Sequence, residues 1–292
     1  MVGEFGNDPA NIVDIIEDPR TKPRTGATVI RLRTGRLDIN TCPQLLVTHG
    51  KMYKPDATKV CSQGAGILAD NLDPNVARAL AAALEDVGEP CFVVAAAEVV
   101  PLPAAQVFTS AHLSKSELAP VDVSGKLDRC PWTQALVLSL AHVTEQVTET
   151  KAAAGNVLSR RVTGLGGFAT AASMATGGTA MKRETVTRSA HPAFLEIVFG
   201  APLRRYRIDG RHFDYSVLGD QLQQSSEANL RTLGRWFLWA APWVRTNVDR
   251  DEMLATGQAP LPQLSEHQLD DLTHWLINLV HFGKAEVESR KW

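Results

Sequence analysis

The sequence predicts an α+β protein in which a small α/β module is followed by an antiparallel β roll and C-terminal helices. Three observations support this class: residues 59–94 carry helix and strand signals in succession, strand patterns flank residues 146–192, and two helix patterns follow residue 224. The chain has 292 residues, of which 44% are hydrophobic and 21% are charged. This balance is typical of chains that fold around a packed core.

The α/β module is expected over residues 28–96, after a flexible N-terminal arm at 1–27 that contains several prolines and acids. Within the module, Thr28–Leu32 and Gln44–Thr48 have the apolar character of short strands. Pro55–Ser62 is predicted to form a helix. The arm lacks the apolar stretch of a secretory signal, and a cytoplasmic protein is therefore expected.

The clearest local signals lie in residues 59–94. Asp73 is placed as a helix N-cap, where its carboxylate can accept a free backbone N–H, and Pro74 follows at the first helical position. Apolar residues then recur at helical spacing up to Gly88, which suits the positive φ of a helix end. Cys91–Val94 is uniformly apolar and predicts a buried strand.

The order of alanine, leucine and glycine from Val60 to Gly88, ending in Ala83-Leu84-Glu85-x-x-Gly88, resembles the second half of the C-terminal domain of the bacterial ribosomal stalk protein. That resemblance implies a small α/β sandwich and supports a local βααβ fold. The family's lysine-rich factor-binding helix has no good counterpart in His49–Lys59. Ribosomal function is therefore not carried over.

The β roll with its helices is expected over residues 97–292. Pro120–Val123 and Asp128–Trp132 predict a hairpin around a Ser-Gly turn, and Ala135–Val143 predicts a buried strand. A strand is also predicted at FLEIVFG, residues 194–200.

The next predicted strand is in residues 205–215, where Asp209–Gly210 is a hairpin signal. Such a roll resembles the pleckstrin-homology-like fold. Residues 146–192 are expected to be a flexible insertion in the roll, because small and polar residues dominate them. Their uncharged part, 162–181, is long enough for a second hypothesis, peripheral membrane association, although its many glycines and threonines argue against this.

Two helices are predicted near the C-terminus. Ser225 or Ser226 can cap the first of them, and Pro242 limits it. Ser265 and Gln268 form a capping-box pattern ahead of the second helix.

Trp236, Trp239 and Trp243 are spaced to share one helical face, which is the first candidate binding site. Such a face can be a ligand platform or a partner site if it is exposed. The alternative is that the three rings pack inside the domain, because each can bury a large area.

A second candidate is the basic cluster of Arg204, Arg205, Arg207 and Arg211, which could bind phosphate or an acidic partner. Its alternative is a set of solvated strand ends. His212 and Asp214 are two residues apart and would point the same way in a strand, so they could form a His–carboxylate pair for acid–base chemistry.

These features together favour a non-enzymatic, cytoplasmic binding or scaffold protein with a protein partner. The net charge of −2 argues against a nucleic-acid partner. No cofactor, metal or catalytic residue is expected, because the four cysteines are widely spaced and no phosphate-loop or zinc-site motif occurs. The alternative is an enzyme or small-ligand sensor with a pocket near the 204–215 hairpin.

Overall fold

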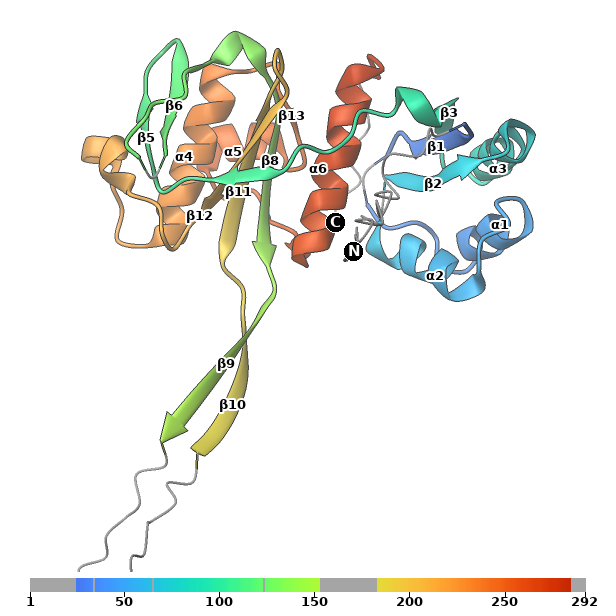
Figure 1. Cartoon of the computed structure of the whole chain (residues 1–292), viewed down its shortest axis with the longest axis horizontal. Coiled ribbons are helices and arrows are strands. Elements are labelled where there is room, and N and C mark those ends of the chain that lie inside the picture. The colour runs from blue at the N-terminus through green and yellow to red at the C-terminus, as the bar shows by residue number, and fades with distance from the viewer. Residues whose placement is uncertain (1–24, 34, 65, 123, 153–182, 285–292) are drawn as a thin grey trace, which may run out of the picture. The chain divides into compact units, whose positions relative to one another are not determined.

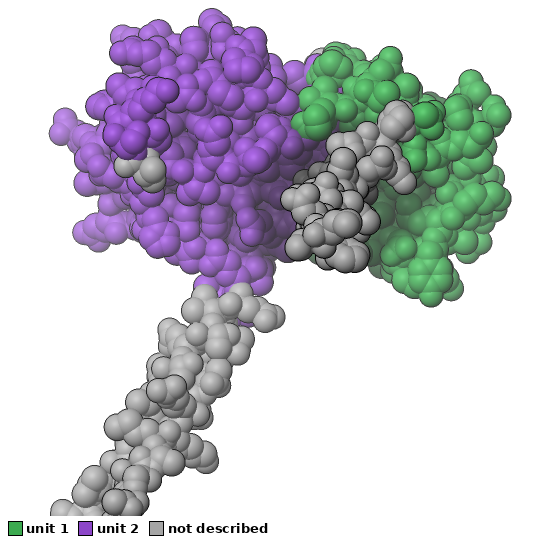
Figure 2. Space-filling model, viewed as in Figure 1, with its two compact units in different colours: residues 1–101, 281–292 green, residues 102–280 purple. Residues whose placement is uncertain are grey.

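The structure is a computed structural model that describes residues 25–33, 35–64, 66–122, 124–152 and 183–284. It contains helices and several sheets, and it therefore has the predicted α+β class. The chain forms two compact units, residues 1–101 with 281–292 and residues 102–280 (Figure 2). The change of unit after residue 101 lies close to the module boundary expected at residue 96.

The first unit is a three-stranded antiparallel sheet in the order β2-β1-β3, with helices packed on it (Figure 1). Its elements are β1 (Ala27–Arg31), α1 (Cys42–Thr48), α2 (Lys54–Gln63), β2 (Ile67–Leu72), α3 (Pro74–Asp86), β3 (Cys91–Ala95) and the 3₁₀ turn Ala96–Glu98.

The local signals around α3 are confirmed. Asp73 caps the helix, because its carboxylate accepts the backbone N–H of Asn75 at 2.8 Å and of Val76 at 3.3 Å. Gly88 has a φ of +79°, a conformation that costs a residue with a Cβ more than it costs glycine. The capped helix places Leu80 and Leu84 in the core of this unit.

Two secondary-structure expectations in this unit were wrong. Residues 44–48 belong to helix α1, which has Pro43 in its first turn and buries Cys42 and Leu46 four positions apart. The second error concerns β2, a strand in a region expected to be a turn; it pairs with β1 at the edge of the sheet. The module is thus βααβαβ and not βααβ.

The second unit is built on a mixed sheet in the order β13-β8-β11-β12-β4, with β14 also paired to β8. Its sheet strands are β4 (Ala105–Val107), β8 (Ala135–Val143), β11 (Ala193–Phe199), β12 (Arg204–Asp209), β13 (Arg245–Thr246) and β14 (Gln263–Leu264). A second, three-stranded antiparallel sheet contains β5 (Ser110–Leu113), β6 (Glu117–Val121) and β7 (Cys130–Pro131). The helical segments are Trp132–Gln134 and Tyr215–Gln221, both 3₁₀, and α4 (Ser226–Ala240), α5 (Arg250–Thr256) and α6 (Glu266–His281).

The expectation of a purely antiparallel roll is corrected by this pairing. The central strands β8, β11 and β12 are antiparallel, but β4, β13 and β14 each join the sheet in parallel. These added strands have only two or three residues. The resemblance to a pleckstrin-homology-like roll remains a prediction.

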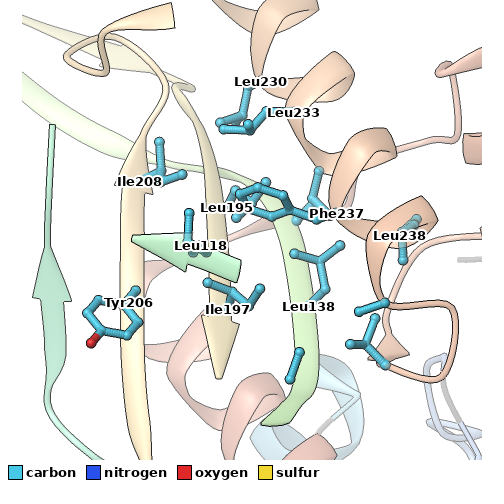
Figure 3. Packing of buried hydrophobic residues seen from close by; sticks show 14 of the residues in the cluster. Leu118, Leu138, Leu195, Ile197, Tyr206, Ile208, Leu230, Leu233, Phe237 and Leu238 are labelled. Atoms are coloured by element: carbon cyan, nitrogen blue, oxygen red, sulfur yellow. The ribbon is translucent and has the colours of Figure 1, made fainter. Parts of the chain in front are cut away.

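Alternation along the central strands gives the sheet two buried faces of different character. Leu195 and Ile197 of β11 point toward α4 and contribute to the main apolar core (Figure 3). That core also contains Leu138, Tyr206, Ile208, Leu230, Leu233 and Phe237. Glu196, between the two core residues, points to the opposite face, where α6 packs.

The caps predicted for the late helices are confirmed. Ser225 begins α4, and its hydroxyl accepts the backbone N–H of Ala228 at 3.2 Å. Ser265 and Gln268 form a capping box before α6, with bonds of 2.7 and 3.2 Å in the two directions.

The hairpin expected around Asp209–Gly210 is not formed. Strands β11 and β12 pair through the earlier turn at residues 200–203, and β12 ends at Asp209. The Asp-Gly turn leads instead to the 3₁₀ segment Tyr215–Gln221, which carries the chain to α4.

The insertion begins and ends as a paired ribbon. Strands β9 (Glu145–Ala152) and β10 (Arg183–Ala190) pair antiparallel and extend from β8 and β11 (Figure 1). These two strands differ from the loop expected for 146–192. Residues 153–182, which include the segment 162–181 of the membrane hypothesis, lie outside the described residues.

Candidate binding surface

The surface of α4 that faces away from the sheet carries two neighbouring tryptophans. Leu233 and Phe237 of the same helix are buried in the core, so the sequence of α4 fixes which side remains outside. Trp236 is half-buried and packs against Trp132, with the ring centroids 5.7 Å apart. Trp239, one turn later, is 62% exposed. The first tryptophan is thereby held in place, while the second presents most of its ring to solvent.

The two rings line an open groove of about 630 Å³. Their centroids are 6.3 Å apart and their planes are inclined by 51°. We call this feature the Trp groove; it is lined by Gln221, Gln223, Thr232, Arg235, Trp236, Trp239 and Leu254. Its volume lies in the range of ligand pockets, about 300–1,000 Å³.

The lining of the Trp groove combines apolar rings with one cation. Arg235 is the only charged residue among those that line it, and no ion pair of Arg235 is found within the described residues. Gln223 donates from Nε2 to Thr232 Oγ1 at 2.8 Å, so part of the polar lining is ordered by its own hydrogen bond. A partner with apolar and anionic groups would complement this surface.

Trp243 does not share the face predicted for the three tryptophans. Helix α4 ends at Ala240, and the chain turns before Trp243. This third ring is 55% exposed and donates from Nε1 to the carbonyl of Ala135 at 3.1 Å. It is absent from the lining of the Trp groove. The prediction of a shared face therefore holds for Trp236 and Trp239 and is wrong for Trp243.

Arg205 and Arg207 are not solvated strand ends and do not form an open anion site. Both are buried on the α6 side of β12, and they share the fully buried carboxylate of Glu196. Arg205 Nε lies 3.0 Å and Arg207 Nε 2.6 Å from that carboxylate. Asp270 of α6 also pairs with both guanidinium groups. Burial acts to lower the pKa of Arg207, but the pairing with Glu196, Asp270 and Glu266 outweighs it and raises the pKa.

Arg204 points to the other side of the sheet and pairs with Asp128. The same carboxylate accepts the hydroxyl of Tyr206, whose pKa is raised by burial and by this hydrogen bond. The contact ties the β6–β7 sheet to β12. Arg204 therefore contributes to the fold through its ion pair with Asp128. It does not line the Trp groove.

Arg211 and His212 both bind Asp209. Arg211 also pairs with Glu145 at 2.7 Å, and His212 Nδ1 lies 3.0 Å from Asp209 Oδ2. Burial acts to raise the pKa of Asp209, but hydrogen bonds from Arg211 and His212 outweigh it and hold the pKa below its ordinary value. Asp214 instead caps the following 3₁₀ segment through the N–H of Ser216.

The proposed His212–Asp214 pair is thus not formed. The His212 side chain is 68% exposed, which gives no enclosed pocket for acid–base chemistry at this position.

Sequence reasoning missed several residues that matter in this structure. Glu196 could have been noticed, because it is a lone acid within an apolar strand and points away from the neighbouring Leu195 and Ile197. Two arginines with a period of two on the next strand complement it. Leu254 gives no comparable signal, because α5 brings it to the groove only through tertiary packing.

Comparison with protein families, with curated proteins and with solved structures finds no match for this chain. In the described ranges, no group of three or more His, Cys, Asp or Glu side chains is arranged to hold a metal ion. None of the helices described has the length and apolar character needed to cross a membrane. The inference of function therefore depends on the geometry of the chain's own surface.

Proposed function

We propose that this chain is a non-enzymatic binding protein that recruits a partner protein through the Trp groove. The observation that carries the proposal is the pairing of a fixed ring, Trp236, with a largely exposed ring, Trp239, in the lining of an open groove. Exposed tryptophans that line a depression are typical anchors of protein interfaces. A single exposed apolar residue would carry no such inference.

The arginines support the same proposal by their placement. Arg205 and Arg207 are occupied by Glu196 and Asp270, whereas Arg235 is an exposed cation in the lining of the groove. The Trp groove therefore combines a cation with an exposed aromatic ring.

Selection of peptides from a random display library on the full chain tests the proposal, with Trp239→Ala as the test variant and Trp243→Ala as the control. Both rings are more than half exposed, but only Trp239 lines the groove. The selected peptides are expected to bind the Trp243→Ala variant normally and the Trp239→Ala variant more weakly by about 2 kcal/mol or more. Selected peptides that keep their affinity for a folded Trp239→Ala variant would contradict the proposal.

A further inference from the structure

We infer that the Trp groove binds an extended, proline-containing segment that carries acidic residues. This inference rests on the proposed function and adds the chemistry of the partner. It is drawn from the two inclined rings, the cation and the polar groups that line the groove.

The rings account for proline. Trp236 and Trp239 are 6.3 Å apart between centroids and inclined by 51°, so their faces do not stack on each other and remain available at the groove. Aromatic-lined grooves of this kind bind proline-rich segments in the polyproline II conformation, which is already extended before binding and loses little entropy.

The position of Arg235 accounts for the acid. Arg235 lies four residues before Trp239 on α4, and such neighbours on a helix face have Cβ atoms about 5–6 Å apart. A polyproline II segment rises about 3.1 Å per residue, so two residues span about 6 Å, which matches the spacing of these two positions on the helix. The groove lining contains no acidic side chain that would repel it or compete with it.

The polar groups in the lining favour a partner with an extended backbone over a helical partner. A polyproline II segment makes no internal hydrogen bonds, and its carbonyl groups need donors. Gln221 and Gln223 in the lining each carry an amide with two N–H donors, of which Gln223 uses one for Thr232. A helical partner satisfies its own backbone and would make little use of these amides.

Single-stranded RNA is the main competing occupant, because bases also stack on tryptophan and phosphates also bind arginine. One cation in the lining and a net charge of −2 for the chain do not supply the basic surface that phosphates require. A peptide with a few carboxylates is therefore favoured over a polyanion.

Fluorescence anisotropy with the full chain and labelled synthetic peptides tests the inference. The probes are a peptide of Pro-Pro-Asp repeats, a peptide with lysine in place of the aspartates, a peptide with alanine in place of the prolines, and oligouridylate. The Pro-Pro-Asp peptide is expected to bind most tightly. Equal or tighter binding of the alanine peptide or of oligouridylate would overturn the inference.

Three variants locate the binding. Trp239→Ala should weaken the Pro-Pro-Asp peptide by about tenfold or more, whereas Trp243→Ala should leave it unchanged. Arg235→Gln should weaken it by about twofold to fivefold and remove its advantage over the lysine peptide. Because Trp239 and Arg235 are both exposed, circular dichroism is expected to show a normal fold.

The outcomes separate this inference from the proposed function. If library peptides require Trp239 but contain neither proline nor acid, the partner class is wrong and the proposed function stands. If neither the library peptides nor the Pro-Pro-Asp peptide depends on Trp239, both are wrong.

Discussion

Replacement of Glu196 by alanine should strongly destabilise the second unit. Its carboxylate is completely buried and receives hydrogen bonds from Arg205, from Arg207 and, at 2.6 Å, from the hydroxyl of Thr273. Removing one partner from a buried ion pair costs about 3–5 kcal/mol, because the remaining charge stays out of water without compensation.

The loss of stability within that range depends on how well the remaining acidic partner, Asp270, compensates the two arginines. Asp270 still pairs with both arginines in the variant, but its side chain is 36% exposed and only partly replaces a buried carboxylate. We therefore expect a loss of about 3 kcal/mol. That is a large fraction of the 5–15 kcal/mol by which a typical domain is stable.

Urea unfolding followed by tryptophan fluorescence measures this loss. All the tryptophans except Trp292 lie in the second unit, so the signal reports mainly on that unit. Glu227→Ala is the matched control. The Glu227 side chain is 45% exposed and pairs with Arg231 one turn away and with His142 at 3.4 Å, and an exposed ion pair is worth about 0.2–1 kcal/mol. If Glu196→Ala and Glu227→Ala lower the free energy of unfolding equally, the buried carboxylate does not stabilise the fold as argued. Glu196→Gln, which keeps the volume, should lose less than the alanine variant and provides the measurement if that variant does not fold.

Further predictions concern the ties within each unit. Tyr206→Phe removes the hydroxyl that binds Asp128 and should lower the free energy of unfolding of the second unit by about 1–3 kcal/mol in the same urea assay. An unchanged unfolding midpoint would show that this hydrogen bond contributes nothing. Gly88→Ala places a Cβ at a φ of +79° and should lower the free energy of unfolding of the first unit by about 1–2 kcal/mol. The loss should appear as faster labelling of the cysteines of this unit by a thiol reagent, and labelling at the wild-type rate would contradict the prediction. Cys42 and Cys61 are fully buried, and burial raises the pKa of Cys61 from 9.0 to about 12, so both thiols should resist labelling until the unit unfolds. The Cys61 thiol ionises near pH 9 in the unfolded chain but keeps its proton in the folded one. The free energy of unfolding of this unit should therefore fall as the pH rises above 9. A free energy of unfolding that stays constant above pH 9 would contradict the pKa shift.

The elements that could be predicted from the sequence are those whose signals lie within a few residues. Asp73 and Gly88 mark the ends of α3 because capping and positive φ are local requirements. The error at residues 44–48 has a local cause too: a short apolar run fits either a strand or a helix, and Pro43 at the helix start was the deciding signal. Strand β2 was missed because its partner β1 is about 40 residues away, and pairing at that range leaves no local signature.

The candidate site was harder to predict because exposure depends on which faces other elements cover. The arginines of β12 could be recognised as a cluster, but their burial depends on α6, about 60 residues later in the chain. The tryptophans posed the opposite problem. Their spacing indicated a shared helical face. Trp243 lies beyond the end of α4 at Ala240, however, and the groove beside Trp236 and Trp239 is completed by Leu254 of α5.

The second unit buries charges on one face of its sheet and exposes aromatic rings on the helix that covers the other. Buried charges are costly unless they are paired. Glu196 and its two arginines pair with one another beneath α6 and are therefore not free to bind a ligand. An exposed tryptophan contributes little to folding, and truncating Trp239 should therefore change binding without changing stability. If the proposed function is right, Glu196→Ala should lower stability and Trp239→Ala should lower binding, so the two variants should separate these properties.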